Sequence, residues 1–463
     1  MGIFFAAMIS AFILLTLGGL SALILWRPLA NWMADRILKR LLTDPYPENL
    51  AEMLNVFTKE GVQNTLESDL RASDGQILKR PFGSPIHMSP WNDLLFNPVY
   101  LTRLPIDEGI EVKTDVTIGP LAKKPLKLGM PIIVGGMAYG IGVSKKVRLA
   151  LAQGADMAET AVNAGVGPLL PEERQKTKRL ILQYSRGTWG KDEETLKQAD
   201  MIEIQLGYGA LGSAPVTLAP SEISEDFRNF MDLQPEEGLQ LQATMPGVKN
   251  GYDLIALVRR LRALTGGVPI GVKIGATHLL ERELDIITRA KLDFITIDGA
   301  EAGISFGPAI LGDDLGLPTL PALCRAANYM KRRRLRGKVS LIVSGGLVTP
   351  GQFLKAIALG ADAVAVGTVV MLTLAHTQIA KATPFEPPTD LIFEVGKIKD
   401  NLSVKTASKS VGNFLKSCNQ EMILAMRSMG RTSLDQLTPA DLCALTQTTA
   451  DLTGVELALK SPS

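Results

Sequence analysis

The stretch from Lys338 to Ala375, KVSLIVSGGLVTPGQFLKAIALGADAVAVGTVVMLTLA, constrains the fold most, because it contains the pattern strand, glycine turn and helix twice in succession. The strands are predicted at Val339–Val343 and Ala361–Val366, and the turns after them at Gly345-Gly346 and Gly367-Thr368. Short, continuous apolar runs of this kind are typical of strands buried on both faces. The stretch therefore predicts parallel strands joined by helices.

The two turns also suit a ligand. Glycine lets the backbone approach a ligand closely, and a helix N-terminus presents unpaired N–H groups to an anion. In a (β/α)8 barrel, the turns after the last two strands are a common phosphate site. We therefore expect Gly345, Gly346, Gly367 and Thr368 to hold a phosphate; the alternative is that these glycines only allow strand and helix to pack closely.

Six further strands precede this stretch, and helical patterns separate most of them. The eight barrel strands are expected at Pro131–Val134, Asp156–Ala161, Leu180–Tyr184, Met201–Leu206, Pro269–Ile274, Phe294–Asp298, Leu341–Ser344 and Ala363–Val366. Eight alternating units predict an α/β fold, a closed (β/α)8 TIM barrel, and favour it over an open sheet. A chain of 463 residues is long enough for such a barrel and further segments.

The N-terminus predicts a membrane helix. The segment from Ile3 to Trp26 contains no charged residue and is long enough to cross a bilayer. Arg27, Arg36, Lys39 and Arg40 follow it closely, so the positive-inside rule places the rest of the chain in the cytoplasm. No Lys or Arg precedes the apolar run, which argues against a cleaved signal peptide. The alternative is a helix buried in the core.

The segments around the barrel are expected to be less regular. Prolines punctuate residues 43–110, with one helix near Glu48–Lys59, and a hairpin is expected from Ile110–Ile118 and Leu126–Leu128. The expected domains are a transmembrane helix at 1–26, a juxtamembrane and wrapping segment at 27–110, the barrel at 111–385 and a C-terminal helical extension at 386–463. The excursion from Gly207 to Gly247 is expected to cover the barrel mouth.

Charge and cysteine content exclude several classes of function. The formal net charge is only +2, which gives no argument for nucleic-acid binding. Cys324, Cys418 and Cys443 lie far apart and form no C-x-x-C pair, so neither a zinc site nor a disulfide framework is indicated. We expect no bound metal.

Sites in such barrels lie at the carboxyl ends of the strands. The residues expected there as cofactor ligands are Gly135, Gly136, Met137, Glu159, Lys273, Ser344, Gly345, Gly346, Gly367 and Thr368, and those expected to take part in catalysis are Lys273, Gln205 and Asp298.

Lys273 is the most informative of these residues, because a lysine inside the apolar strand PIGVKIG needs an anionic partner. A flavin ring, which gains negative charge on reduction, would be such a partner. The alternative is a structural ion pair with Glu159 or Asp298. Asp298 could orient a substrate or cap the next helix, and Gln205 could bind a ligand or be a hydrogen-bonded core amide.

Seven segments in order resemble the FMN-binding synthase domain of glutamate synthase, above all its stand-alone form with an N-terminal membrane helix. They are PIIVGGMAYG, DMAETAVNAGVG, IEIQLGYG, PIGVKIGA, FITIDGAEAG, LIVSGGL and AVAVGTV, between about residues 110 and 375. The resemblance implies FMN with its ring over Gly135–Met137, Lys273 near N1 of the ring, and the phosphate at Gly345, Gly346, Gly367 and Thr368.

This sequence departs from the family pattern at three places. The cysteine cluster that follows the eighth strand in glutamate synthases is replaced by LTLAHTQIAKATPFEPP, so no iron–sulfur cluster is expected. The glycine loop after the fourth strand, which carries Lys and Glu in the family, reads Gly207 to Gly212, and the motif after the second strand reads Asn163 to Pro168. Residues that would hold the carboxylates of 2-oxoglutarate are thus partly missing.

Other flavin or nucleotide barrels fit less well. An inosine-monophosphate dehydrogenase needs a nucleophilic cysteine after the sixth strand, and Gly303–Pro308 has none. A hydroxy-acid oxidase needs a histidine base near that strand end, where the sequence is IDGAEAG. Among the three histidines, only His278 follows a strand closely enough to reach the mouth.

The expected function is that of a membrane-anchored FMN oxidoreductase that reduces a 2-oxo acid imine to an amino acid, in glutamate biosynthesis. The expected partners are a small-molecule substrate, an external electron donor and the membrane, with a separate amidotransferase or a second copy of the chain as further candidates. The alternatives are an FMN oxidoreductase with a different, membrane-proximal substrate, or a non-catalytic FMN-binding scaffold.

Overall fold

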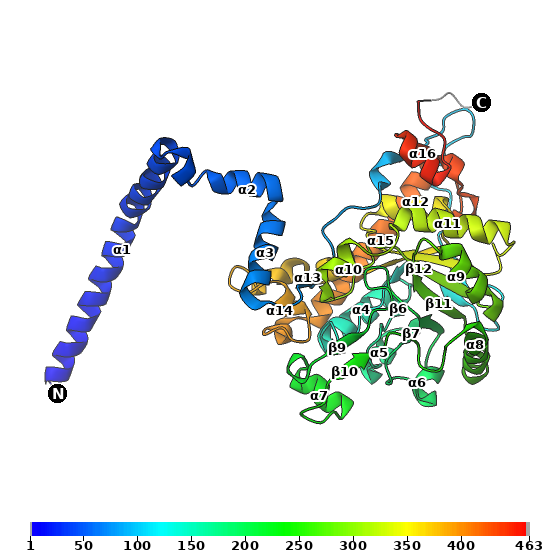
Figure 1. Ribbon diagram of the computed structural model, residues 1–463, viewed down its shortest axis with the longest axis horizontal. Coiled ribbons are helices and arrows are strands. Elements are labelled where there is room, and N and C mark those ends of the chain that lie inside the picture. Colours follow the sequence, from blue (N-terminus) through cyan, green and yellow to red (C-terminus); the bar gives the residue numbers. More distant parts are fainter. Residues whose placement is uncertain (1, 460–463) are drawn as a thin grey trace. The chain divides into compact units, whose positions relative to one another are not determined.

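The computed structural model describes residues 2–459 and divides into two compact units, Met1–Leu78 and Lys79–Ser463. The first unit contains α1 (Gly2–Thr43), α2 (Glu52–Glu60) and α3 (Val62–Asp74) (Figure 1). The division falls inside the predicted wrapping segment, so only its second part, from Lys79, belongs to the same unit as the barrel.

Helix α1 carries the predicted membrane span. Met8–Thr43 is long and apolar enough to cross a membrane, with a mean hydropathy of 2.3 in its most apolar part. Its large apolar side chains, such as Phe12 and Leu23, are exposed. This finding does not fit the alternative of a buried core helix. The basic stretch after Trp26 continues the same helix, with Pro28 inside it.

The second unit is built on a closed parallel barrel, as predicted. Its strands follow one another around the ring in the order β11-β12-β14-β15-β5-β6-β7-β8. Their bounds are β5 (Ile132–Val134), β6 (Val162–Asn163), β7 (Leu180–Tyr184), β8 (Met201–Gln205), β11 (Ile270–Gly275), β12 (Phe294–Asp298), β14 (Ser340–Ser344) and β15 (Ala363–Val366).

The helices between the strands surround this ring (Figure 1). They are α4 (Lys145–Met157), α5 (Pro171–Lys176), α6 (Glu193–Lys197), α8 (Gly251–Thr265), α9 (Leu280–Ile287), α10 (Ala309–Asp313), α11 (Thr319–Arg332), α12 (Pro350–Ala358) and α13 (Thr368–Ala375). Side chains cap several of them: the Ser144 hydroxyl accepts from the N–H of Val147 at the start of α4.

The prediction for the second strand was wrong. Helix α4 continues to Met157, and β6 begins at Val162, whereas the strand was expected at Asp156–Ala161. Between them Glu159 has φ 56, a left-handed conformation that ends a helix. Between the end of α4 and the start of β6 the sequence has neither glycine nor proline. The sequence pattern therefore does not show where the helix ends and the strand begins.

The amino end of the barrel is closed by the predicted hairpin. β3 (Val116–Ile118) and β4 (Leu126–Leu128) pair antiparallel, and their buried side chains join inward-facing strand residues such as Phe294 in one apolar cluster. The N–H of Gly129, just after β4, donates to the carbonyl oxygen of Glu159 at 2.9 Å. Polar side chains must therefore gather at the other, carboxyl end.

A hairpin excursion follows β8. It consists of β9 (Val216–Leu218), α7 (Glu225–Met231) and β10 (Leu239–Leu241), and β9 pairs antiparallel with β10. Ser224 caps α7 and donates a hydrogen bond of 2.6 Å to Glu394, which ties the excursion to the C-terminal extension.

The C-terminal extension packs on the barrel and on the segment that precedes it. It contains α14 (Thr389–Ile392), α15 (Val404–Ser428), β16 (Leu442–Ala444) and α16 (Gln447–Thr453). β16 pairs with β2 (Leu94–Phe96), and β1 (Lys79–Arg80) pairs with β13 (Gly307–Pro308). Helix α15 approaches α4 so closely that a Cβ at Gly154 would lie 2.7 Å from Cβ of Val411.

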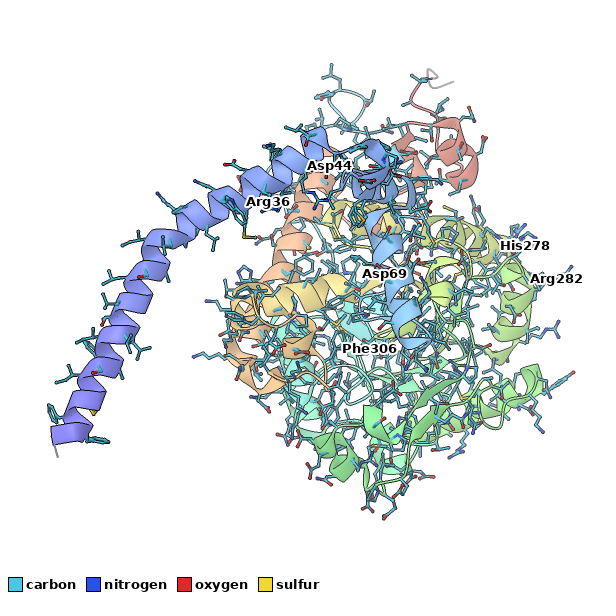
Figure 2. The ribbon with its side chains drawn as sticks, turned by 60° about the vertical axis from the view of Figure 1, so that its left-hand side comes forward. Arg36, Asp44, Asp69, His278, Arg282 and Phe306 are labelled. Atoms are coloured by element: carbon cyan, nitrogen blue, oxygen red, sulfur yellow. The ribbon has the colours of Figure 1, made fainter. Side chains whose placement is uncertain are left out.

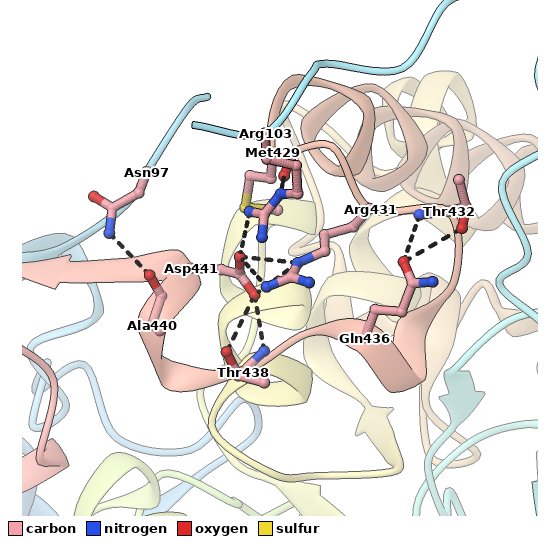
Figure 3. A network of polar contacts seen from close by, with 9 residues as sticks. All are labelled: Asn97, Arg103, Met429, Arg431, Thr432, Gln436, Thr438, Ala440 and Asp441. Atoms are coloured by element: carbon pink, nitrogen blue, oxygen red, sulfur yellow. Dashed lines mark hydrogen bonds and ion pairs between the residues drawn. The ribbon is translucent and has the colours of Figure 1, made fainter. Parts of the chain in front are cut away.

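Asp441 joins the C-terminal extension to the segment that precedes the barrel. Its buried carboxylate accepts hydrogen bonds of 3.0 Å from both Arg103 and Arg431, and one of 2.9 Å from the backbone N–H of Thr438 (Figure 3). Arg103 also donates to the carbonyl oxygen of Met429 at 2.8 Å. Burial of a carboxylate with this many donors costs little, because its oxygens keep their hydrogen bonds.

Candidate functional site

Three glycine turns lie side by side at the carboxyl end of the barrel. They end the neighbouring strands β14, β15 and β5, so Gly345, Gly367 and Gly135 follow adjacent strands. The N–H of Gly135 donates to the carbonyl oxygen of Val366 at 2.8 Å, which joins two of the turns directly. The structure thus places the six predicted glycine-turn ligands Gly135, Gly136, Gly345, Gly346, Gly367 and Thr368 on one side of the barrel mouth.

Backbone geometry explains the glycines of the β14 turn. Gly345 has φ 123 and Gly346 φ 61, conformations that other residues rarely adopt. A Cβ at Gly345 would lie 2.4 Å from Oγ1 of Thr319. These two residues are required for the turn itself, whatever it binds.

Gly367, at the start of α13, differs from the glycines of the β14 turn, because no described residue lies so close that it requires a glycine there. A Cβ at Gly367 would meet no atom within 4 Å, and no side chain caps the helix. By contrast, Thr349 caps the neighbouring helix α12 by accepting from the N–H of Gln352. An uncapped helix N-terminus beside open space is a favourable place for an anionic group.

Lys273 lies inside the barrel between two carboxylates. Its side chain is 6% exposed, and Nζ lies 3.5 Å from Oε1 of Glu203 and 3.5 Å from Oδ1 of Asp298. The alternative ion pair with Asp298 is therefore present, whereas the one with Glu159 is not. Burial alone would lower the pKa of Lys273, but the carboxylates of Asp298 and Glu203 outweigh it and raise the pKa above its ordinary value.

Glu203 connects the strands around Lys273. Its Oε1 accepts hydrogen bonds of 2.8 Å from both Asn163 and Gln183, and its Oε2 accepts one of 2.7 Å from the Thr296 hydroxyl. These partners come from β6, β7 and β12. A carboxylate so fully satisfied fixes the positions of its neighbours, Lys273 among them.

Asp298 has fewer partners. The Ser344 hydroxyl donates to its Oδ1 at 2.5 Å, so Ser344 lies in the polar cluster at the strand ends. Burial raises the pKa of Asp298 above its ordinary value, against the opposing charge of Lys273. Asp298 lies in this cluster and not at the start of a helix, so the structure does not support its alternative role as a helix cap.

One predicted cofactor ligand, Glu159, and one residue only considered for the mouth, His278, lie outside the site. Glu159 is exposed and precedes β6, at the closed amino end of the barrel, so the prediction that it contacts a cofactor was wrong. His278 is exposed just before α9, at the periphery with Arg282 (Figure 2). Met137 follows the β5 turn and is buried, with its carbonyl oxygen accepting from Arg148 at 2.8 Å.

Sequence interpretation missed Glu203, although a signal was present. Side chains alternate along a strand, so Glu203 must face the same side as Gln205, two positions later. Gln205 itself is fully buried and lies beside Arg186, another residue that the sequence did not single out. Tyr208, after β8, places its hydroxyl 3.5 Å from Oε1 of Gln183, and burial raises its pKa.

Comparisons with known proteins match this architecture. Residues 98–432 match the family model described as the conserved region in glutamate synthase. A glutamate synthase large subunit-like protein of Rhizobium meliloti (strain 1021) is 29% identical over 82% of this chain and 90% of its own. An archaeal glutamate synthase (NADPH) of Archaeoglobus fulgidus is 27% identical over 86% of this chain and 81% of its own.

Solved structures show the same fold. A mutant flavocytochrome b2 with pyruvate bound superposes with a TM-score of 0.52 at 14% identity, covering 92% of this chain and 95% of that one. Another, with benzoylformate, has a TM-score of 0.51 at 13% identity, covering 80% of each chain. At such low identity the likeness shows the fold alone.

Proposed function

The chain belongs to the glutamate synthase family, defined by the conserved region that its residues 98–432 match, and on this premise we propose that it is an FMN-dependent oxidoreductase of glutamate synthase type. The substrate would be a 2-oxo acid imine, reduced to an amino acid. The observation that carries the proposal is the barrel mouth, where three adjacent glycine turns face a buried Lys273 cluster.

The residues at the mouth fit FMN. Gly345, Gly346, Gly367 and Thr368 would hold its phosphate, since the space at Gly367 and the uncapped α13 suit an anion. Gly135, Gly136 and Met137 would lie against the ring. Bound there, FMN would supply the hydride-transfer chemistry that protein side chains lack.

Lys273 would act as a fixed positive charge. The raised pKa keeps Nζ protonated, so the lysine is no base at neutral pH. Glu203 and Asp298 hold it at the strand end, and charge that develops nearby during a reduction would be stabilised without rearrangement of the site. Gln205 would contact the substrate, and Asp298 would orient it.

The experiment that tests the reaction follows the flavin of the full chain, purified in detergent. The chemically reduced protein is mixed with 2-oxoglutarate and ammonia, and flavin reoxidation and glutamate are measured. Rapid, substrate-dependent reoxidation with glutamate formed is expected. Reoxidation by other acceptors only would support the second candidate, an oxidoreductase with a different substrate, which the altered segments Asn163–Pro168 and Gly207–Gly212 favour. Reoxidation by no acceptor would leave the scaffold alternative.

The partners of the reaction follow from the same proposal. An external donor would reduce the flavin, and ammonia or a separate amidotransferase would supply nitrogen. Because LTLAHTQIAKATPFEPP replaces the family's cysteines after β15, we expect purified protein to contain no iron or acid-labile sulfide. Stoichiometric iron would contradict this expectation.

The proposed phosphate site can be tested by introducing one negative charge at Gly367. Gly367→Asp should keep the fold, because a Cβ at this position meets nothing within 4 Å. Its carboxylate should repel the phosphate, so FMN should be lost on desalting. Gly367→Asn, of the same size and without charge, should retain more FMN. Equal FMN content in the two variants, measured by absorbance, would show that the phosphate lies elsewhere.

We further propose that α1 anchors the chain in a membrane with the barrel in the cytoplasm. Deleting residues 1–26 should remove tight partition into membranes, because the apolar part of α1 is lost. A reporter fused after Ser463 should give a cytoplasmic signal. Fractionation of the deletion variant with membranes after a carbonate wash, or a signal from the opposite side, would contradict the topology.

A further inference from the structure

Two arginines in the described part of the chain are fully buried, and they differ in their partners. Arg148 is 0% exposed and pairs through two nitrogens with the carboxylate of Glu173. Arg186, also 0% exposed, has no carboxylate within 4 Å among the residues that the structure describes. A buried charge without a counter-ion is costly, so Arg186 needs an explanation.

The backbone satisfies only part of the Arg186 guanidinium. Nη1 donates to the carbonyl oxygens of Ser213 at 2.6 Å and Gln242 at 2.9 Å, and more weakly to those of Ala214 and Ala243 at 3.3 Å. These carbonyls lie at the two ends of the β9–β10 hairpin. Nη1 thus holds the base of the excursion, but carbonyl groups leave the positive charge uncompensated.

The remaining donors point to a missing acceptor. Nη2 of Arg186 and Nε2 of Gln205 are both buried and, within residues 2–459, neither has a hydrogen-bond partner. The two side chains touch, since Nε of Arg186 donates to Oε1 of Gln205 at 3.4 Å. Two adjacent groups that can only donate, one of them cationic, match a planar carboxylate.

The position of this pair in the ring separates it from the phosphate site. Arg186 follows β7 and Gln205 ends β8, whereas the glycine turns of the phosphate site follow β14 and β15. In the eight-strand ring, β7 and β8 lie opposite β14 and β15, and Lys273 on β11 follows next to β8. A ligand bound by Arg186 and Gln205 would therefore lie across the mouth from the FMN phosphate.

We propose that Arg186 and Gln205 form the subsite for a carboxylate of the substrate. The inference rests on the proposed function and assigns to it residues other than the altered segments after β6 and β8. Burial lowers the pKa of Arg186, so the incoming carboxylate would also restore the stability of its charged form.

The test uses Gln205→Glu in the full chain with FMN bound, because this variant supplies the missing anion from within. Pairing with Arg186 should raise the unfolding temperature. Binding of 2-oxoglutarate, measured by calorimetry, should weaken about tenfold or more, since the ligand loses charged hydrogen bonds to an occupied guanidinium. The dimethyl ester of 2-oxoglutarate should bind weakly to wild type and variant alike.

Gln183→Glu is the matched control. It introduces the same change on β7, but beside the carboxylate of Glu203, to which Gln183 donates at 2.8 Å. Its unfolding temperature should fall, because two buried carboxylates would then share one site. Opposite shifts in the two variants would show that the missing anion lies at Arg186.

Two results would overturn the subsite. One is a more stable Gln205→Glu variant that binds 2-oxoglutarate as wild type does, which would make Arg186 a clamp for the hairpin only. The other is a wild-type protein that holds FMN but shows no binding of 2-oxoglutarate. Both are distinct from failure of the proposed function, which would appear as absence of FMN or of flavin reoxidation.

Discussion

Lys273→Met is expected to lower both the stability of the fold and the two-electron potential of the bound flavin. The change leaves Glu203 and Asp298 buried without the cation 3.5 Å from each of them. Breaking a buried ion pair by removing one partner costs about 3–5 kcal/mol. The volume is roughly kept, so lost packing contributes little.

The fall in potential has a separate cause. A flavin ring gains negative charge on reduction and is neutral when oxidised, so a nearby cation favours the reduced state. Each loss of about 1.4 kcal/mol from the reduced state lowers the potential by about 30 mV. The potential can be measured by equilibration with redox dyes, independently of turnover.

A double variant separates the two effects. Lys273→Met with Glu203→Gln removes one carboxylate together with the lysine, so much of the stability should return. The potential should stay low, because the cation is still missing. If the double variant binds FMN normally at the wild-type potential, Lys273 is a structural ion pair and the flavin lies elsewhere.

Arg148→Met should destabilise the barrel by about 3–5 kcal/mol, since it leaves the fully buried Glu173 unpaired. It also removes the donors to the carbonyl oxygens of Met137 at 2.8 Å and Asn163 at 3.0 Å, which anchor the turns after β5 and β6. Urea unfolding followed by circular dichroism would measure the loss. FMN retention should weaken in parallel, because the β5 turn loses its support.

The chain offers a matched control on the same two helices. Lys145 and Glu172 also join α4 to α5, at 2.6 Å, but both are nearly half exposed. Lys145→Met should therefore cost no more than about 1 kcal/mol. Arg148→Met combined with Glu173→Leu should recover part of the loss. Equal costs for Arg148→Met and Lys145→Met would show that burial of the pair does not determine its contribution.

The barrel could be predicted from the sequence because most of its strands are continuous apolar runs that end at glycine or polar residues. Phe294–Asp298 and Leu180–Tyr184 are predicted to the residue for this reason. β6 could not be placed, because it has two residues and follows an apolar helix end without a turn signal. This one error also explains why Glu159 was predicted at the carboxyl end of the barrel, although it lies at the amino end.

Within the site, residue type and strand position predicted Lys273, Asp298 and, as an alternative, the ion pair between them, but not Glu203. The ion pair with Glu203 depends on the pairing register of the neighbouring strands β8 and β11, which places Lys273 opposite Gln205. Arg186 gave no signal, because an arginine in the loop SRGTWG resembles any surface arginine until the β9–β10 hairpin covers it. Burial and pairing of polar groups are tertiary properties, and the linear pattern does not carry them.

The most direct test of the central claim is the absorbance spectrum of the full chain purified gently in detergent, with the released cofactor identified. The account predicts a yellow protein with one FMN per chain, bound at the three glycine turns after β14, β15 and β5. A colourless protein that takes up no added FMN would contradict it.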